Sequence, residues 1–275
     1  MDEKAAAKAH KQAEQLLRER RFAEAWPLFE GRRWMSGTHT RAPLADYPEW
    51  MGEDLSGKSI MVVAEQGFGD QFMFGRYLPL LAARAAKVEI LCHPTIWPVF
   101  GQAGYSGHPF FVNRPAPTAD FWVLMGSLPL RLGVNDPPPP VWLPRAGSGS
   151  GVGVRTAGSP THFNDKNRSL PYRQACDLRA LGTDLDPAET GAKSFLDTAQ
   201  IIYALELVVS VDTSVVHLAG AMGRQFWVLL PKANTDWRWA DGVSSPWYPD
   251  AKLYPQPRLG DWRSVLKAVS RDLAR

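Results

Sequence analysis

The chain has 275 residues, and its 31 lysines and arginines against 28 aspartates and glutamates give a formal net charge of +3. With 45% hydrophobic and 21% charged residues, the composition excludes wholesale disorder. The near-balanced charge disfavours a nucleic-acid binder. No apolar run approaches the roughly 20 residues of a membrane-spanning helix. The charged N-terminus differs from a secretory signal. We therefore expect a cytoplasmic protein in which Cys92 and Cys176 are free thiols.

Residues 1–35 are predicted to form a helical hairpin, with helices over 5–18 and 22–30. Leu17, Phe22 and Trp26 fall on one apolar face. The small and aromatic positions resemble the closing part of a tetratricopeptide repeat. Because an isolated repeat is unstable, this hairpin is expected to dock on something else, and a protein partner or self-association through the hairpin are candidates.

Residues 36–146 are predicted to form a first Rossmann-like lobe. Short apolar runs without polar alternation, at 59–64, 88–92, 110–112 and 121–124, are typical of strands buried on both faces of a parallel sheet. A helical pattern runs from Gln71 to about Ala86. Strands that alternate with helices indicate an α/β fold.

Residues 147–275 are predicted to form a second lobe, because the proline- and glycine-rich stretch 135–151 is typical of a linker. Strands are expected at 152–154, 207–211 and 226–230, and helices at 197–205, 215–222 and 261–273. Between Ser169 and Phe195 there is little room for a full helix–strand unit, and 179–185 is the one candidate strand. In open α/β sheets ligands bind beyond the carboxyl ends of the strands, so we expect the functional loops to face a cleft between the lobes.

The first candidate loop is the short turn after Val211, where a buried strand leads directly into a helix. The first amides of that helix lack intrahelical partners, and Thr213 and Ser214 add hydroxyls, so the turn is suited to a diphosphate. In the alternative interpretation, Asp212, Thr213 or Ser214 is only a helix cap, and His217 is an interior histidine.

The second candidate loop contains Gly67, Gly69 and Asp70, also between a strand and a helix. Glycines allow a close backbone approach to a ligand or a positive φ. Asp70 is the candidate general base for an attacking hydroxyl, and Glu65 is a second one. Alternatively, Asp70 only caps the helix.

The third candidate loop follows the first strand of the second lobe. Lys166 and Arg168 could neutralise phosphate charge, while Thr156, Ser159 and His162 could donate hydrogen bonds. An ordinary polar surface loop is the alternative. The six histidines share no short metal-ligand spacing, so we expect no metal site.

Taken together, these motifs resemble one family: the glycosyltransferases related to bacterial lipopolysaccharide heptosyltransferases (family 9-like), in the variety that follows tetratricopeptide repeats. The motifs, in chain order, lie at 64–70, 76–81, 157–162, 164–169, 210–220, 236–239 and 245–249.

This resemblance implies a GT-B fold and a metal-independent, inverting sugar transfer without a cofactor. Asp70 would be the acceptor base, the turn at 212–214 would hold the donor diphosphate, and Lys166 or Arg168 would offset its charge. Trp237 would lie near the donor. The substrates would be a nucleotide sugar and a glycan or protein acceptor. Two alternatives remain: a non-catalytic sugar-nucleotide-binding or scaffold protein, and an epimerase on the same fold.

Overall fold

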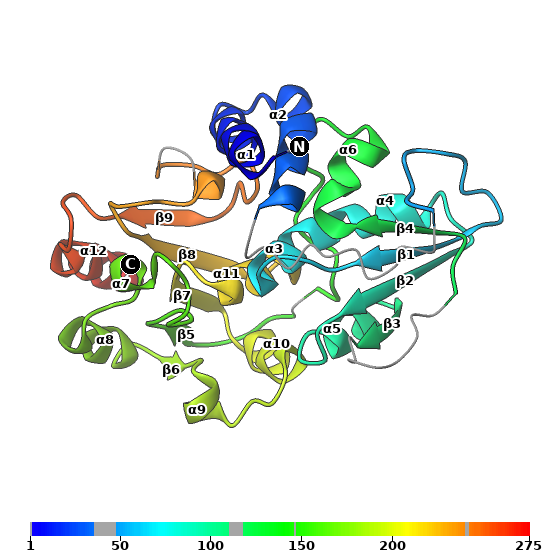
Figure 1. Cartoon of the computed structure of the whole chain (residues 1–275). Coiled ribbons are helices and arrows are strands. Elements are labelled where there is room, and N and C mark those ends of the chain that lie inside the picture. The colour runs from blue at the N-terminus through cyan, green and yellow to red at the C-terminus, as the bar shows by residue number, and fades with distance from the viewer. Residues whose placement is uncertain (1, 36–47, 110–117, 146, 240–241) are drawn as a thin grey trace. The chain divides into compact units, whose positions relative to one another are not determined.

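The protein is described from a computed structural model, which covers residues 2–35, 48–109, 118–145, 147–239 and 242–275. The chain divides into two compact units (Figure 1). Unit 1 comprises Met1–Pro144 with Ser194–Leu196, and unit 2 comprises Arg145–Lys193 with Asp197–Arg275. None of the helices within these described ranges has the length and apolar character needed to cross a bilayer.

Unit 1 begins with the predicted hairpin, formed by α1 (Glu3–Arg18), α2 (Phe22–Phe29) and the 3-10 helix η1 (Glu30–Trp34). The side chain of Asp2 caps α1 by accepting a hydrogen bond from the amide of Ala5. The predicted apolar face is buried, with Leu17, Phe22 and Trp26 at most 5% exposed. The rings of Trp26 and Phe29 pack against Phe74, so the hairpin docks on its own unit.

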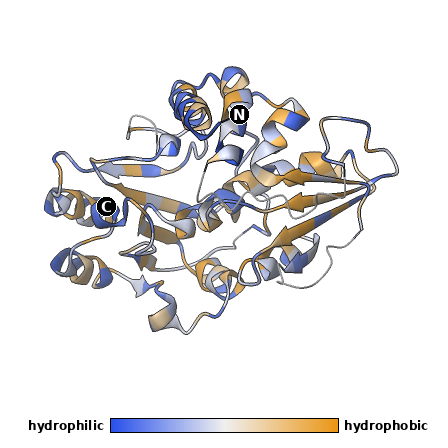
Figure 2. Ribbon diagram, in the orientation of Figure 1, coloured by the Kyte–Doolittle hydropathy of each residue, from blue (hydrophilic) through white to orange (hydrophobic). Residues whose placement is uncertain are grey.

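The core of unit 1 is a four-stranded, all-parallel sheet with strand order β3-β2-β1-β4. Its strands are β1 (Ser59–Val63), β2 (Lys87–Cys92), β3 (Ser106–Pro109) and β4 (Phe121–Leu124). The strands predicted at 59–64, 88–92 and 121–124 are confirmed. The run 110–112 lies outside the described residues. Figure 2 shows that these strands are apolar. Strands of a parallel sheet are covered on both faces, so both sets of side chains must be apolar.

The helical pattern predicted from Gln71 to about Ala86 is confirmed as far as Ala82, although it is divided into separate helices. The chain forms α3 (Phe68–Phe74), the 3-10 turn η2 (Gly75–Tyr77) and α4 (Leu78–Ala82). Pro79 stands in the first turn of α4, and because it has no amide hydrogen it cannot continue an earlier helix. The remaining helices of unit 1 are α5 (Trp97–Gln102), η3 (Met125–Ser127) and α6 (Leu128–Leu132).

Unit 2 contains a five-stranded, all-parallel sheet with strand order β6-β5-β7-β8-β9. Its strands are β5 (Val152–Arg155), β6 (Thr183–Asp184), β7 (Leu207–Val211), β8 (Gln225–Leu230) and β9 (Lys252–Pro255). The predicted strands at 152–154, 207–211 and 226–230 are confirmed. The sequence pattern missed β9, where only Tyr254 is buried.

Helices cover both faces of this sheet. On one face, α8 (Tyr172–Arg179) and α12 (Trp262–Leu273) pack against the side chains of Val209 and Leu229. On the other, α11 (Ser214–Ala221) lies against β7 and β8. Asp261 caps α12 as predicted, through the amide of Ser264. The remaining helices are α7 (Asp165–Arg168), α9 (Pro187–Thr190), α10 (Phe195–Ala204) and η4 (Trp237–Trp239).

The segment between Ser169 and Phe195 holds more structure than its length suggests. It contains the eight-residue helix α8, the two-residue strand β6 and the short helix α9. The candidate strand at 179–185 is confirmed by β6, and the unit fits into the limited room because its helix and strand are short. Because β6 pairs with β5 through only two residues, a very short edge strand completes the unit.

Two helical glycines give opposite predictions for the same substitution. In Gly220→Ala the new Cβ would lie 2.5 Å from Cε1 of Tyr248, so overpacking should cost about 1–3 kcal/mol. In Gly101→Ala nothing lies within 4 Å of the new Cβ, so alanine should stabilise α5 by about 0.5–1 kcal/mol. Thermal unfolding measured by circular dichroism should show opposite shifts in Tm. Shifts of the same sign would contradict the packing described for Gly220.

Candidate functional site

Three loops of unit 2 start at the carboxyl ends of neighbouring parallel strands. They are the segments 156–169 after β5, 212–214 after β7 and 231–236 after β8. The buried side chain of Asn164 joins the first loop to the third, because its amide donates hydrogen bonds to the carbonyls of Ala233 and Asn234 at 3.1 and 3.0 Å. The strand order therefore brings together segments that lie up to 80 residues apart in the sequence.

Arg168 joins the first loop to the second. Its Nη1 donates a hydrogen bond to the carbonyl of Asp212 at 2.8 Å, and its Nε pairs with Asp165 at 3.2 Å. The guanidinium lies over Gly158, where a Cβ would come within 2.4 Å of Nη2. A larger residue at position 158 would therefore force the guanidinium of Arg168 to shift from this position.

At the start of α11, the capping alternative is confirmed for Thr213. Its hydroxyl accepts a hydrogen bond from the amide of Val215 at 3.4 Å and lies 3.3 Å from the hydroxyl of Ser210. Ser214 is half-buried in the first turn of the helix. The guanidinium of Arg168, bonded to the residue before the cap, and the positive end of the helix dipole thus occupy the same corner.

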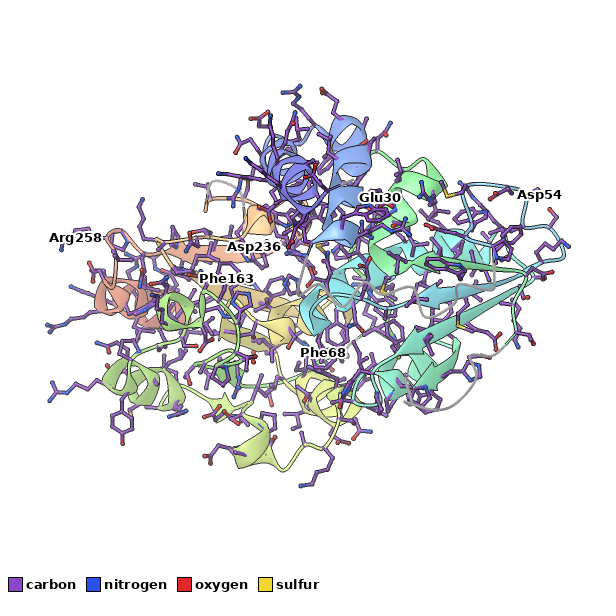
Figure 3. The ribbon with its side chains drawn as sticks, in the orientation of Figure 1. Glu30, Asp54, Phe68, Phe163, Asp236 and Arg258 are labelled. Atoms are coloured by element: carbon purple, nitrogen blue, oxygen red, sulfur yellow. The ribbon has the colours of Figure 1, made fainter. Side chains whose placement is uncertain are left out.

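Asp212 and Asp236 place two carboxylates near each other at this corner. Burial raises the pKa of Asp212 to about 6, and the negative charge of Asp236 adds to the effect, while Arg238 and Arg168 oppose it. Asp236, labelled in Figure 3, is paired with Arg238 at 2.9 and 3.0 Å. Asp212 therefore holds its proton more tightly than an ordinary aspartate does.

His217 and Trp237 lie in an aromatic cluster rather than at the surface. The Nδ1 atom of His217 is 2.8 Å from the hydroxyl of Tyr248, and its ring stacks on Trp239. Trp237 is 4% exposed, with the guanidinium of Arg238 4.2 Å from its ring centroid and the ring of Trp247 edge-on to it. This placement favours the interior interpretation of His217 and puts Trp237 in the core of unit 2.

The other predicted donor-binding residues differ in exposure. Thr156 is buried at the end of β5. Ser159 and His162 are exposed; the Ser159 hydroxyl pairs with Thr161, and the His162 ring accepts a hydrogen bond from the amide of Asn164. Lys166 is exposed, and among the described residues it has no ion pair. Lys166 is therefore available to an external anion.

The predicted loop with Gly67, Gly69 and Asp70 belongs to unit 1, where it joins β1 to α3. Gly67 has a φ of −75° and serves as the N-cap residue of α3, whereas Gln66 takes the left-handed φ of 61°. The carboxylate of half-buried Asp70 accepts a hydrogen bond from the amide of Gly67 at 3.0 Å. Asp70 therefore supports the start of α3, in agreement with the capping alternative, although it does so from within the first turn.

Glu65, the second candidate base, is 3% exposed and paired with Arg32. A carboxylate enclosed in this way is poorly placed to meet an acceptor hydroxyl, so Asp70 is the better candidate.

Sequence reasoning missed Asp236, Arg238 and Asn164 as members of the site. In the segment 236–239, the sequence analysis singled out Trp237. The charged pair Asp236 and Arg238 is the part of this segment that affects the pKa of Asp212. Asn164 gives no distinctive signal in the sequence, because its role is to join two loops. In the part of the chain that the structure describes, no three histidine, cysteine, aspartate or glutamate side chains gather as a metal site would require.

No protein-family model matches the sequence. Protein FlbA of Caulobacter vibrioides is 25% identical to the chain over 92% of its length. The chain spans about half of that relative, 52% of its length.

Among solved structures, the chain is similar to heptosyltransferase WaaC of E. coli with ADP-2-deoxy-2-fluoro heptose. The TM-score is 0.53 at 11% identity, over 78% of this chain and 99% of that one. The glycosyltransferase TibC of enterotoxigenic E. coli, described as iron-containing and dodecameric, follows with a TM-score of 0.49 at 12% identity, over 80% and 78% of the two chains. The likeness to WaaC shows that the chain has the predicted α/β, GT-B-like fold of two Rossmann-like lobes.

The raised pKa of Asp212 predicts a pH-dependent stability difference for Asp212→Asn. Because the folded protein binds this proton more tightly than the unfolded chain, the carboxyl favours folding at low pH, and this contribution is lost as the pH rises from about 4 to about 6. Above pH 6 the free energy of unfolding of the variant should therefore exceed that of the natural protein by on the order of 1–2 kcal/mol, and its Tm should be higher.

The difference should shrink towards zero near pH 4. Differential scanning calorimetry from pH 4 to 8 would measure it, with Asp177→Asn on the exposed side of α8 as the control for an aspartate-to-asparagine change. A pH-independent difference, or a variant less stable at pH 8, would contradict the description of Asp212.

Proposed function

We propose that this chain is a glycosyltransferase that moves a sugar from a nucleotide-sugar donor to a glycan or protein acceptor by an inverting mechanism. The observation that carries the proposal is the meeting of Arg168 with the start of α11 at the carboxyl ends of β5 and β7. A guanidinium fixed beside the positive end of a helix dipole is an arrangement suited to a diphosphate.

In the proposed site, unit 2 holds the donor. Arg168 and the amides at the start of α11 would bind the diphosphate, and exposed Lys166 would add a second positive charge. These groups would stabilise the charge that develops on the diphosphate as the bond to the sugar breaks. Cationic side chains would provide this charge stabilisation, and no cofactor would take part in it.

In the proposed transfer, Asp70 is the general base. Its carboxylate would take the proton from an acceptor hydroxyl while that oxygen forms a bond to the anomeric carbon of the sugar. The bond between this carbon and the diphosphate oxygen breaks at the same time, so the nucleoside diphosphate leaves and the configuration inverts. An aspartate whose position in the first turn of α3 is fixed by the amide of Gly67 is suited to this role.

The structural likeness to the heptosyltransferase WaaC supports the proposal at the level of class. The solved structure of WaaC contains an ADP-linked sugar. A donor screen for this chain should therefore begin with ADP-linked sugars and continue with UDP-, GDP-, TDP- and CMP-linked ones. A cytoplasmic location and self-association through the hairpin stay predictions.

The alternative function is a non-catalytic sugar-nucleotide-binding protein. One observation favours it: Asp70 accepts a hydrogen bond within its own helix turn, as a purely structural aspartate would. The two functions differ in what Asp70 does, which the second experiment below tests.

Lys166→Ala is predicted to weaken donor binding without destabilising the fold. Loss of one charge-assisted hydrogen bond, worth about 1.5–3 kcal/mol, corresponds to roughly a 10- to 100-fold rise in Kd. Titration calorimetry with the nucleotide sugar that gives the largest thermal shift would measure the effect. Lys267→Ala, on the exposed side of α12, is the matched control and should bind normally. Equal affinities for both variants would remove Lys166 from the site.

Asp70→Asn is predicted to lower the transfer rate by roughly 10²- to 10⁴-fold while leaving donor affinity unchanged. Asparagine keeps an oxygen that can accept the hydrogen bond from Gly67, so the loop should hold its shape. Nucleotide release in the presence of an acceptor panel would give the rate, with Asp54→Asn, an exposed aspartate of the same unit, as control. Full turnover by the variant would show that Asp70 is not the base. Donor binding by the natural protein without turnover on any acceptor would favour the non-catalytic alternative.

A further inference from the structure

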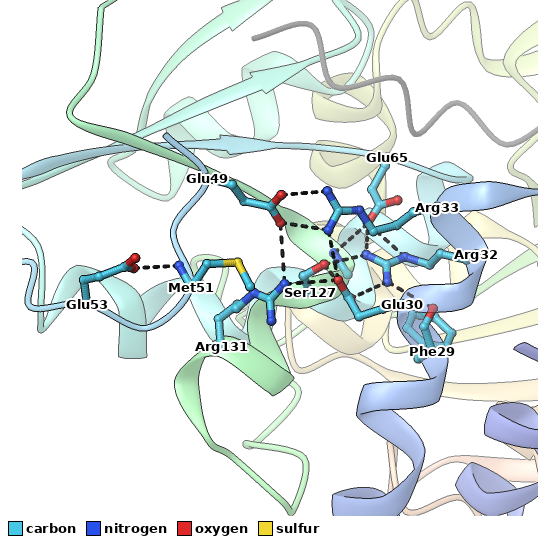
Figure 4. Close-up of polar contacts among 11 residues, drawn as sticks. Phe29, Glu30, Arg32, Arg33, Glu49, Met51, Glu53, Glu65, Ser127 and Arg131 are labelled. Atoms are coloured by element: carbon cyan, nitrogen blue, oxygen red, sulfur yellow. Dashed lines mark hydrogen bonds and ion pairs between the residues drawn. The ribbon is translucent and has the colours of Figure 1, made fainter. Parts of the chain in front are cut away.

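A fully buried arginine joins the N-terminal hairpin to the end of β1. The guanidinium of Arg32 is 0% exposed; its Nη2 and Nε donate hydrogen bonds to Oε1 of Glu65 at 2.5 and 3.1 Å. Its Nη1 pairs with Glu30 at 2.8 Å, and its Nη2 also donates to the hydroxyl of Ser127 at 2.9 Å. Figure 4 shows these contacts converging on one guanidinium.

The carboxylate of Glu65 is held from two sides. Besides Arg32, the amide of Gly126 donates a hydrogen bond to the same Oε1 atom at 3.1 Å. A Cβ at position 126 would lie 2.8 Å from that oxygen, so a larger residue here would have to displace the Glu65 carboxylate or the Arg32 guanidinium. One oxygen of Glu65 thus ties together η1, the end of β1 and η3, three segments that are distant in the sequence.

The residues that follow Glu65 lead directly to the candidate base. Gln66 holds a left-handed φ of 61°, which a residue other than glycine keeps only where its surroundings enforce it. Gly67 then caps α3, and its amide binds the carboxylate of Asp70. The turn is therefore fixed at its start by Glu65 and at its end by the bond to Asp70.

We propose that Arg32 and Glu65 are a positioning pair for Asp70, through which the docked N-terminal hairpin sets the geometry of the loop 65–70. The inference rests on the proposed function of Asp70 as general base. A buried ion pair adds little net stability over an apolar pair of similar size, whereas its directional hydrogen bonds fix the loop. Neither residue touches the acceptor in this proposal, since both side chains are buried.

A second ion pair of the same hairpin provides the matched control. Arg33 binds Glu49 through two hydrogen bonds of 2.9 and 2.8 Å, and Arg131 lies 3.6 Å from the same carboxylate. This pair also joins η1 to the rest of unit 1 (Figure 4), but Glu49 precedes β1, and its carboxylate pairs with Arg33 and Arg131 rather than with the described residues 65–70. Glu49→Gln therefore weakens hairpin docking without touching the turn.

The test compares Glu65→Gln and Arg32→Lys with Glu49→Gln in the full chain. Two quantities are measured: the hydrogen exchange of the amides at 66–71, and kcat together with the donor Kd. We expect Glu65→Gln and Arg32→Lys to speed exchange of these amides at least tenfold. Both should also lower kcat at least tenfold, with the donor Kd unchanged within twofold. Glu49→Gln should resemble the natural protein in both measurements.

Unchanged exchange at 66–71 in a folded Glu65→Gln variant would overturn the proposal. So would an equal fall in kcat for Glu65→Gln and Glu49→Gln, since general destabilisation would then explain both. If the charge variants do not fold, Ser127→Ala removes one partner of Arg32 without altering charge, and it should raise exchange at 66–71 at least threefold. Unchanged exchange in Ser127→Ala would then count against the proposal.

Failure of the proposed function is separable from failure of this inference. If the natural protein transfers no sugar, the assignment of Asp70 as base falls. The exchange measurements on the same proteins still decide whether the Arg32–Glu65 pair holds the loop.

Discussion

Parallel strand pairing is the constraint on which the rest of each unit depends. Parallel strands need crossover connections, whose helices cover both faces of the sheet. All strands therefore end, with their carboxyl termini, on the same side of the sheet. The carboxyl ends of β5, β7 and β8 therefore lie side by side, and so do the loops that leave them. Without this order, Asn164 could not bind the carbonyls of Ala233 and Asn234.

At the carboxyl ends of these strands in unit 2, the arginines do not neutralise the two aspartates equally. Arg238 is committed to Asp236, and Arg168 is directed at the carbonyl of Asp212. The half-buried Asp212 carboxyl is left with a partly desolvated position and a neighbouring negative charge, and both raise its pKa. Such shifted groups are typical of functional sites, and this one lies beside the helix start that we propose binds a diphosphate.

In unit 1, the short helical hairpin has too little core of its own and is stabilised by contacts with the rest of the unit. Aromatic packing of Trp26 and Phe29 on Phe74 supplies the apolar contact, while Arg32 supplies a directional one. The hairpin is thereby part of the same unit as the loop that follows β1. Its contacts explain how a segment near the N-terminus can influence a loop more than 30 residues further along the chain.

The sequence by itself determined the fold class, most strands and the positions of the candidate loops, because apolar runs and strand-to-helix turns are local signals. It also indicated the capping role of Thr213 and Asp261, which depends on residues one turn away. Only the tertiary structure decided that His217 and Trp237 lie in an aromatic cluster, that Asp236 acts on Asp212, and that Glu65 is enclosed by Arg32. Those outcomes depend on partners 10 to 33 residues away, and neither composition nor periodicity carries that information.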